Sequence, residues 1–306
     1  MRWRGRRQSS NVEDRRGRRG MGGGLGGLGG RGVQVGLPRG RRVGGGGLGL
    51  GTIVILLIFA WVFGVNPLSF LDGGSSPQFG PETATEAGRS GTPADDGGQF
   101  VATVLADTED IWGQIFSSAG ENYPEPTLVL FSGSTSSACG FATAASGPFY
   151  CPAESKVYID LAFYDELRSR FRAPGDFAQA YVIAHEIGHH VQNVLGVLPK
   201  VNSMRQRMSE TESNQLSVLV ELQADCYAGI WAHASERMGI VEDGDIDEAL
   251  NAAAAVGDDT IQRRTQGYVV PDSFNHGTSE QRARWFRRGY QTGSVDSCNT
   301  FEMAEP

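Results

Sequence analysis

Two histidines and a glutamate stand close together in this chain and could hold and use a metal ion. Residues 185–189 read His-Glu-Ile-Gly-His. Positions four apart lie on one face of a helix, so His185 and His189 can present two imidazoles to one cation. Glu186 is turned by about 100° from its neighbour, where a carboxylate can take a proton from a water molecule that the ion activates. The motif therefore predicts a zinc site with hydrolytic chemistry.

A catalytic zinc site needs a third protein ligand and one position left free for water. The elongated pattern with glycine at 192 and histidine at 195 is excluded, because these residues are Gln192 and Leu195. Glu221 and Asp225 lie four apart on a predicted helix and share a face. We expect Glu221 to bind zinc and Asp225 to accept the free ring N–H of a ligand histidine. The alternative is two solvated acids. His190 points about 100° away from its neighbour and is not expected to bind.

The elements that position these residues are predicted to be mostly helical. Residues 176–195 form the helix of the motif, with Asp176 as its N-cap. Residues 127–131 and 156–161 have the pattern of short strands, with a Gly/Ser/Ala-rich loop over 132–150 between them. Further helices are expected over 99–118, 162–172, 209–238, 245–256 and 279–291. Many helices with a small early sheet indicate an α+β domain.

The chain has four cysteines, Cys139, Cys151, Cys226 and Cys298. An even number in an oxidising compartment suggests two disulfides, for which three pairings are possible. The local pair Cys139–Cys151 would close the Gly/Ser/Ala-rich loop, which leaves Cys226–Cys298. Four buried thiols are the alternative, and a cysteine metal site is disfavoured because no C-x-x-C spacing occurs.

The charge is distributed very unevenly. The whole chain has a net charge of −8, but residues 1–47 hold 12 arginines and two acids, which leaves −18 on the rest. An acidic main domain repels phosphate, so we expect no nucleic acid as its partner. The glycine-rich segment 1–47 is expected to be a disordered cytoplasmic tail that fixes membrane topology. Binding of RNA or anionic lipid by this tail is the alternative.

Residues 48–65 are 18 consecutive uncharged and mostly apolar residues. As a helix they would be about 27 Å long, enough to cross a bilayer, so we expect an uncleaved transmembrane helix. A cleaved signal peptide and a buried core helix are the alternatives. The preceding arginines predict an N-terminus inside the cytoplasmic membrane and a domain outside it. Residues 66–98 are expected to be a flexible linker to a domain over 99–306.

The segments HEIGHHVQN and ELQADCYAG resemble the neutral zinc metallopeptidase family of bacteria, a group of the zincin type with a glutamate as third ligand. SACG…GPFYCP, KVYIDLAFYDEL and NHGTSEQRARWF extend the resemblance over roughly residues 97–300. The resemblance implies a thermolysin-like core with one Zn²⁺ and one membrane span. It also implies a late histidine or tyrosine near the developing oxyanion. His276, with Arg282 as an orienting group, is our candidate. A loop histidine beside a helix capped by Thr278 and Gln281 is the alternative.

Together these features predict a membrane-anchored peptidase that acts outside the cytoplasm on a protein or peptide substrate. Glu186 would serve as general base, and strand 156–161 would pair with an extended substrate backbone. The alternative is a non-enzymatic assembly or adaptor module that keeps zinc for stability. A structural site usually has a fourth protein ligand, and none is evident in the sequence. The substrate, the oligomeric state and the metal used in vivo are left open.

Overall fold

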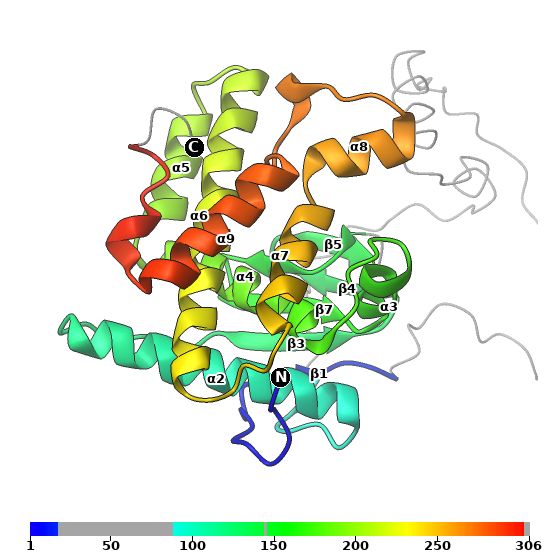
Figure 1. Ribbon diagram of the computed structural model, residues 1–306, viewed down its shortest axis with the longest axis vertical. Coiled ribbons are helices and arrows are strands. Elements are labelled where there is room, and N and C mark those ends of the chain that lie inside the picture. Colours follow the sequence, from blue (N-terminus) through cyan, green and yellow to red (C-terminus); the bar gives the residue numbers. More distant parts are fainter. Residues whose placement is uncertain (18–87, 144–145, 303–306) are drawn as a thin grey trace, which may run out of the picture. The chain divides into compact units, whose positions relative to one another are not determined.

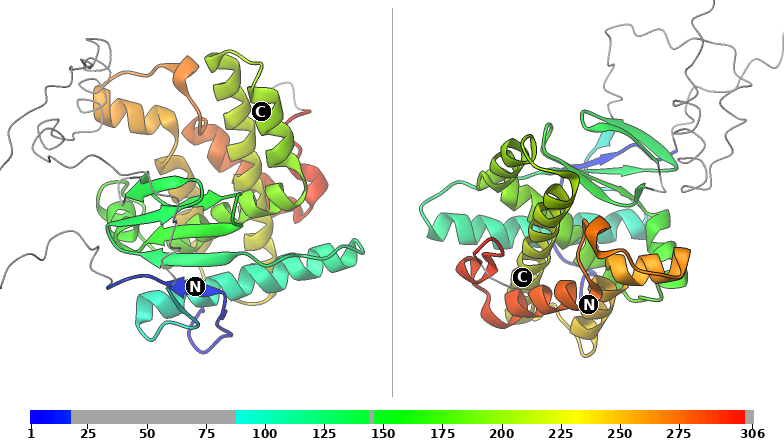
Figure 2. Two further views of the ribbon diagram at one scale, coloured as in Figure 1. Left: turned by 180° about the vertical axis from the view of Figure 1, so that it is seen from behind. Right: turned by 90° about the horizontal axis from the view of Figure 1, so that it is seen from above.

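The computed structural model describes residues 1–17, 88–143 and 146–302. Helices form most of this part, and a small sheet covers one side of them (Figures 1 and 2). The predicted α+β class is therefore confirmed. In the described residues no helix is both long enough and apolar enough to cross a membrane. The predicted transmembrane segment 48–65 lies outside the described residues.

The main sheet has five strands in the order β2-β1-β3-β7-β6. Its centre is β3 (Thr127–Phe131), which pairs in parallel with β7 (Lys156–Asp160). The edge strand β6 (Phe149–Cys151) runs antiparallel to β7. The predicted strands at 127–131 and 156–161 are thus present, but β7 has a partner on both sides. A substrate therefore cannot pair with β7, and the expectation for 156–161 is wrong on this point.

The predicted loop over 132–150 contains more structure than expected. β4 (Ser134–Ser137) and β5 (Gly140–Thr143) form a two-stranded hairpin, and β6 begins at Phe149. β4 is mostly serine and β5 begins with glycine, so these two sequences have little strand character, and β6 has only three residues. Both expected disulfides form: Cys139–Cys151 ties the hairpin to β6, and Cys226–Cys298 joins two distant parts of the chain.

The helices agree with the sequence pattern at most positions. They are α2 (Asp96–Ser118), α3 (Ala162–Ser169), α4 (Asp176–Val194), α5 (Val197–Arg205), α6 (Glu210–Arg237), α7 (Asp245–Ala255), α8 (Asp258–Gln266) and α9 (Ser279–Thr292). The short helices α5 and α8 were not predicted. The cap of α4 is Gly175 rather than Asp176, which is the first helical residue.

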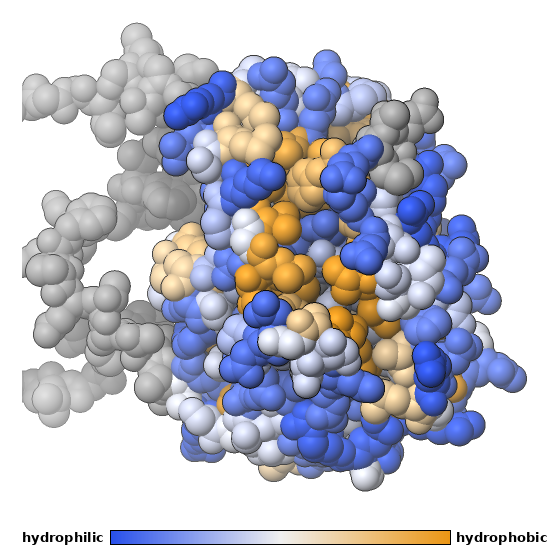
Figure 3. Space-filling model, turned by 90° about the vertical axis from the view of Figure 1, so that its left-hand side faces the viewer, coloured by the Kyte–Doolittle hydropathy of each residue, from blue (hydrophilic) through white to orange (hydrophobic). Residues whose placement is uncertain are grey.

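Apolar residues gather in the middle of one face of the molecule, the face on the left of Figure 1, where α5 lies (Figure 3).

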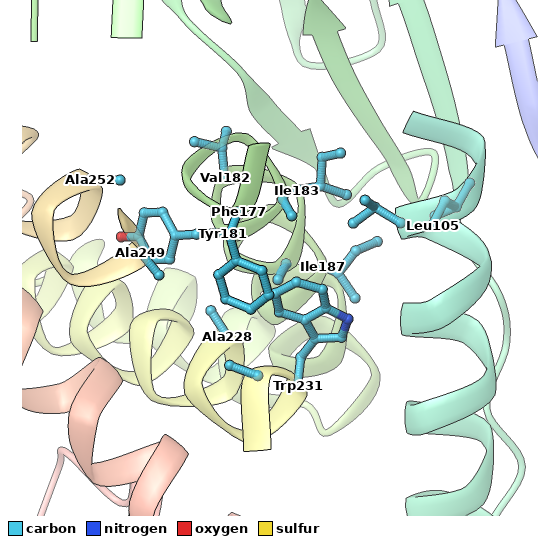
Figure 4. Close-up of a cluster of buried hydrophobic side chains, with 14 of the residues drawn as sticks. Leu105, Phe177, Tyr181, Val182, Ile183, Ile187, Ala228, Trp231, Ala249 and Ala252 are labelled. Carbon is cyan, nitrogen blue, oxygen red and sulfur yellow. The ribbon is translucent and has the colours of Figure 1, made fainter. Parts of the chain in front are cut away.

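Helix α4 lies at the centre of the domain. It packs against α2, α6 and α7, and its buried side chains meet theirs in one core (Figure 4). Gly188 allows α6 to approach closely, because a Cβ there would lie 2.9 Å from the carbonyl oxygen of Ala224. The core thus places the motif of α4 directly against the middle of α6.

Residues 1–17, which we call the N-terminal strap, are part of this domain. Within the strap, β1 (Val12–Asp14) lies between β2 (Arg89–Ser90) and β3, antiparallel to β2 and parallel to β3. The expected disordered tail is therefore wrong for residues 1–17, and the expected linker is wrong for residues 88–98, which form β2 and the start of α2. The rest of the predicted tail and linker lies outside the described residues.

Arginines bind the strap to the acidic domain. Arg6 pairs with Asp107 at 2.8 Å, and Arg7 pairs with Glu109 at 2.9 Å. Both acids are buried on α2, where an unpaired carboxylate would be costly. These arginines, which were expected to fix membrane topology, thus form ion pairs with acids of the same fold.

The position of β1 also restricts membrane topology. A chain that crossed a membrane once between residues 17 and 88 would place β1 and β3 on opposite sides. Their parallel ladder, with Val12 opposite Leu128 and Asp14 opposite Leu130, requires them to be on the same side. The expected arrangement, with the N-terminus inside and the domain outside, therefore requires that β1 does not pair with β3 in the membrane-bound protein.

Candidate metal centre

Helices α4 and α6 bring the three predicted zinc ligands together. His185 and His189 lie one turn apart on α4, and Glu221 faces them from α6. One carboxylate oxygen of Glu221 lies 3.2 Å from Nε2 of His185, and the other lies 3.4 Å from Nε2 of His189. One ligand atom from each of the three residues lies within 4.8 Å of the other two. The spacing in the sequence thus corresponds to a convergent site in space.

The donor set fits zinc in both chemistry and size. Two imidazole nitrogens and one carboxylate are typical ligands of catalytic zinc. Zn–N and Zn–O bonds of about 2.0–2.1 Å in a tetrahedron place neighbouring ligand atoms about 3.4 Å apart, close to the two distances at Glu221. In the described residues, no fourth histidine, cysteine or acid belongs to this group. A tetrahedral zinc ion held by these three residues would keep one position for water.

Asp225 holds the first histidine, as the sequence predicts. It is fully buried, and its Oδ1 lies 2.8 Å from Nδ1 of His185. Tyr181 donates to the same oxygen at 2.5 Å, and Arg282 donates to both carboxylate oxygens at 2.8 and 3.1 Å. A carboxylate on Nδ1 leaves Nε2 to face the ion. Arg282, expected beside His276, instead has Asp225 as its main partner.

Gln192 holds the second histidine, which sequence reasoning did not predict. Its Oε1 lies 2.8 Å from Nδ1 of His189, and its side chain is completely buried. The position follows His189 by three residues, so both side chains lie on one helix face. That spacing is the signal that could have identified it. Each histidine thus has a separate partner at its Nδ1 atom.

The ionisable groups of the site strongly affect one another. Burial disfavours the charged imidazole of His185, but Asp225 and Glu221 outweigh burial and raise the pKa of His185 to about 10. Burial also opposes ionisation of Glu221, yet both histidines hold its pKa well below the usual range. Burial raises the pKa of Glu186. Zinc at this site would compete with a proton for His185.

A cavity of about 630 Å³ opens onto the site. Glu186 lines it beside the candidate ligands, but in the described part of the chain it belongs to no cluster that could hold a metal. Phe149 and Tyr150 of the edge strand β6 line the same cavity. Apolar side chains from five helices complete the wall: Phe163, Val182, Leu198, Val220 and Ile261. The candidate metal site therefore faces a cavity with many apolar side chains in its wall.

His276 reaches the same cavity from the loop before α9. Its side chain is half exposed, and its Nδ1 lies 3.1 Å from Oδ1 of Asp258. Asp258 also accepts the backbone N–H groups of residues 275–277. Thr278 and Gln281 form the expected capping box. The loop is therefore firmly held, and among the described residues the Nε2 atom of His276 has no hydrogen-bond partner.

The chain is similar to known proteins over most of its length. A family model described as "Putative neutral zinc metallopeptidase" matches residues 1–301. The chain is 48% identical to the uncharacterized protein YpfJ of Escherichia coli strain K12 over 302 aligned residues. These residues make up 98% of this chain and 99% of that protein. It is 41% identical to the uncharacterized protein Rv2575 of Mycobacterium tuberculosis strain H37Rv over 221 aligned residues. These residues make up 69% of this chain and 74% of that protein. No solved structure matches.

Proposed function

The chain belongs to the neutral zinc metallopeptidase family, and from this premise we propose that it hydrolyses peptide bonds with zinc held by His185, His189 and Glu221. The observation that carries the proposal is the convergence of these three side chains on one point, with a buried glutamate beside them and no fourth ligand in the described residues. A structural zinc site usually fills its fourth position with protein. The open position therefore favours an enzyme over an adaptor module.

Each residue of the site has a role in this chemistry. Zinc, when bound, supplies Lewis acidity that polarises the substrate carbonyl and acidifies water. Glu186 takes the proton from the attacking water and delivers it to the leaving amine. His276 donates to the oxygen on which negative charge develops. Asp225 keeps His185 in place, and the positive charge of Arg282 allows that aspartate to stay ionised while buried.

The edge strand β6 is our candidate for the substrate-binding strand. In the described residues it pairs only with β7, so its other edge is available for a further strand. Because Phe149 and Tyr150 line the cavity, an extended peptide added to this edge would lie next to the zinc ligands. A metal helix, a second helix with the glutamate ligand and an edge strand along the cavity are consistent with a zincin-like fold.

We also propose that the domain works outside the cytoplasm, in association with the membrane. Two disulfides are typical of an oxidising compartment, and the apolar residues 48–65 favour contact with lipid. Because β1 pairs with β3, we propose that the N-terminal strap lies in the same compartment as the domain.

The decisive experiment replaces Glu186 by glutamine in the full chain. Glu186→Gln keeps the size of the side chain but removes the general base, so we expect unchanged zinc content, near one ion per chain, and a loss of cleavage of an unfolded protein by at least about 100-fold. Glu210→Gln, an exposed residue of α6, is the matched control. Equal inactivity of the wild type and Glu186→Gln towards unfolded proteins and a broad peptide library would favour the adaptor module.

A further inference from the structure

The partner of His189 belongs to a longer chain of buried amides. Nε2 of Gln192 donates to the carbonyl oxygen of Val220 at 2.8 Å and to Oε1 of Gln223 at 3.0 Å. Nε2 of Gln223 donates in turn to the carbonyl oxygen of Cys298 at 3.0 Å. Both glutamine side chains are buried, Gln192 completely and Gln223 to 5% exposure. A continuous hydrogen-bonded path thus runs from a zinc ligand to the C-terminal segment.

The direction of every bond in this path is fixed. The main-chain carbonyl of Cys298 can only accept, so the NH₂ group of Gln223 must face it and its oxygen must face Gln192. The carbonyl of Val220 fixes Gln192 in the same way. The oxygen of Gln192 therefore faces His189, whose Nδ1 must carry the proton. In the neutral imidazole, Nε2 of His189 is then left with a lone pair for a metal.

We propose that Gln192 and Gln223 are positioning residues that hold His189 in its zinc-binding tautomer, through an amide relay anchored on Cys298. The proposal rests on the zinc site proposed above. Neither glutamine lines the cavity, and among the described residues neither belongs to the group of candidate metal ligands. They lower the free energy needed to hold His189 in the orientation and tautomer that bind zinc. Without the relay, His189 can rotate or take the other tautomer, and only a fraction of the molecules can then bind zinc.

The Cys226–Cys298 disulfide holds the far end of the relay. Cys226 follows Gln223 by three residues on the same face of α6, so the disulfide and the Gln223 hydrogen bond attach neighbouring points of α6 to the same residue, Cys298. Loss of the disulfide removes the covalent attachment and leaves the hydrogen bond to hold the segment. Zinc affinity should therefore depend on the oxidation state of this pair.

The test measures zinc affinity by competition with a chelator, without any substrate. Gln192→Met and Gln223→Met keep side-chain length but remove the hydrogen bonds, and Gln215→Met changes an exposed glutamine of the same helix α6. We expect Gln192→Met to weaken zinc binding 10- to 100-fold, Gln223→Met to weaken it less, and Gln215→Met to leave it within twofold. Wild-type affinity for Gln192→Met or Gln223→Met would overturn the relay.

Stability measurements separate a positioning role from misfolding. Each variant is unfolded in EDTA and again in excess zinc, because the stabilisation by zinc reflects affinity for the folded state. A tenfold loss of affinity lowers this increment by about 1.4 kcal/mol at a fixed zinc concentration. If Gln192→Met lost stability in EDTA but kept the full zinc increment, the role of Gln192 would be structural and the proposal would be wrong.

The disulfide variants test the anchored end. We expect the double variant Cys226→Ser/Cys298→Ser to bind zinc several-fold more weakly than the wild type, and Cys139→Ser/Cys151→Ser, which breaks the other disulfide, to bind it normally. Equal affinities would overturn the dependence on Cys226–Cys298. A failure of the relay is distinguishable from a failure of the proposed function. The first leaves zinc binding intact in the glutamine variants, and the second leaves the wild type without zinc or without cleavage.

Discussion

The two histidine ligands are held by partners of different charge. His185 faces an ionised carboxylate, Asp225, whereas His189 faces a neutral amide, Gln192. With zinc bound, the positive charges of the ion and of Arg282 balance the negative charges of Glu221, Asp225 and Glu186. A second carboxylate in place of Gln192 would leave this buried site with an excess negative charge. The neutral relay orients its histidine without that cost.

Replacement of Asp225 by asparagine should weaken zinc binding and the fold together. The variant leaves the positive charge of Arg282 buried without its carboxylate partner. We expect a loss of zinc affinity of 10- to 100-fold and a loss of stability of about 3–5 kcal/mol in EDTA. Chelator competition and urea unfolding measure the two effects. Unchanged stability would show that this aspartate does not compensate the arginine.

Replacement of His276 by alanine should affect catalysis and leave zinc binding unchanged. If this histidine stabilises the developing oxyanion, kcat should fall by about 100-fold or more, while KM and zinc affinity change little. Steady-state kinetics on a peptide cleaved by the wild type test this expectation. A variant with wild-type kcat would restrict His276 to its contacts with Asp258 in the loop before α9.

The sequence supports predictions at the residue scale where function depends on local spacing. The intervals between His185 and His189 and between Glu221 and Asp225 each correspond to one helical turn, so their shared faces could be predicted. Gln192 and Gln223 are uncharged and common residue types, and their roles depend on the packing of α4 against α6. No pattern in one helix predicts which side chain of another helix it meets.

The structure of the strap was the least predictable from the sequence. The strap is arginine-rich and precedes a long glycine- and arginine-rich stretch, and β1 has only three residues. Its strand pairing comes from β3, more than a hundred residues later. By contrast, α4, α6 and α9 have strong helical periodicity or capping boxes, which are local signals and could be predicted.

A buried carboxylate of β1 makes the attachment of the strap dependent on pH. Burial opposes ionisation of Glu13, but Arg15 and Lys156 outweigh burial and lower its pKa from 4.5 to about 2. A lowered pKa stabilises the folded state above pH 4.5, and this contribution disappears as the pH falls towards 2. The shift corresponds to at most about 3 kcal/mol.

Replacement of Glu13 by glutamine should therefore destabilise the domain at pH 7 by up to about 3 kcal/mol, and the difference from the wild type should shrink between pH 4.5 and pH 2. Urea unfolding in EDTA at several pH values measures this difference. The exposed residue Glu121 provides the control, Glu121→Gln, for which we expect no such change. A difference that stays constant with pH would contradict ionisation of Glu13 as its source.

At the scale of the whole molecule, the uneven charge has a new interpretation. The basic N-terminus and the acidic remainder were expected to lie on opposite sides of a membrane. Six arginines of the strap instead form ion pairs in the described structure. Five of them pair with acids outside the strap: Arg2, Arg4, Arg6, Arg7 and Arg16. The same composition can therefore encode intramolecular attachment as well as topology, and the sequence alone does not distinguish them.

The shared sheet predicts that the strap and the domain are accessible from the same side of the membrane in cells. Ser10 is exposed on the strap and Ser117 is exposed at the end of α2, so Ser10→Cys and Ser117→Cys provide matched positions in a chain whose own cysteines are paired. We expect a membrane-impermeant maleimide to label both positions in cells whose outer envelope has been opened and whose cytoplasmic membrane is intact.

Labelling of both positions only after lysis would agree with the pairing of β1 and β3 but would mean that the domain lies inside the cytoplasm. Labelling of Ser117→Cys in intact cells and of Ser10→Cys only after lysis would mean that the membrane separates the two. β1 could then not pair with β3 in the membrane-bound protein, and the acids of α2 would have to find other partners.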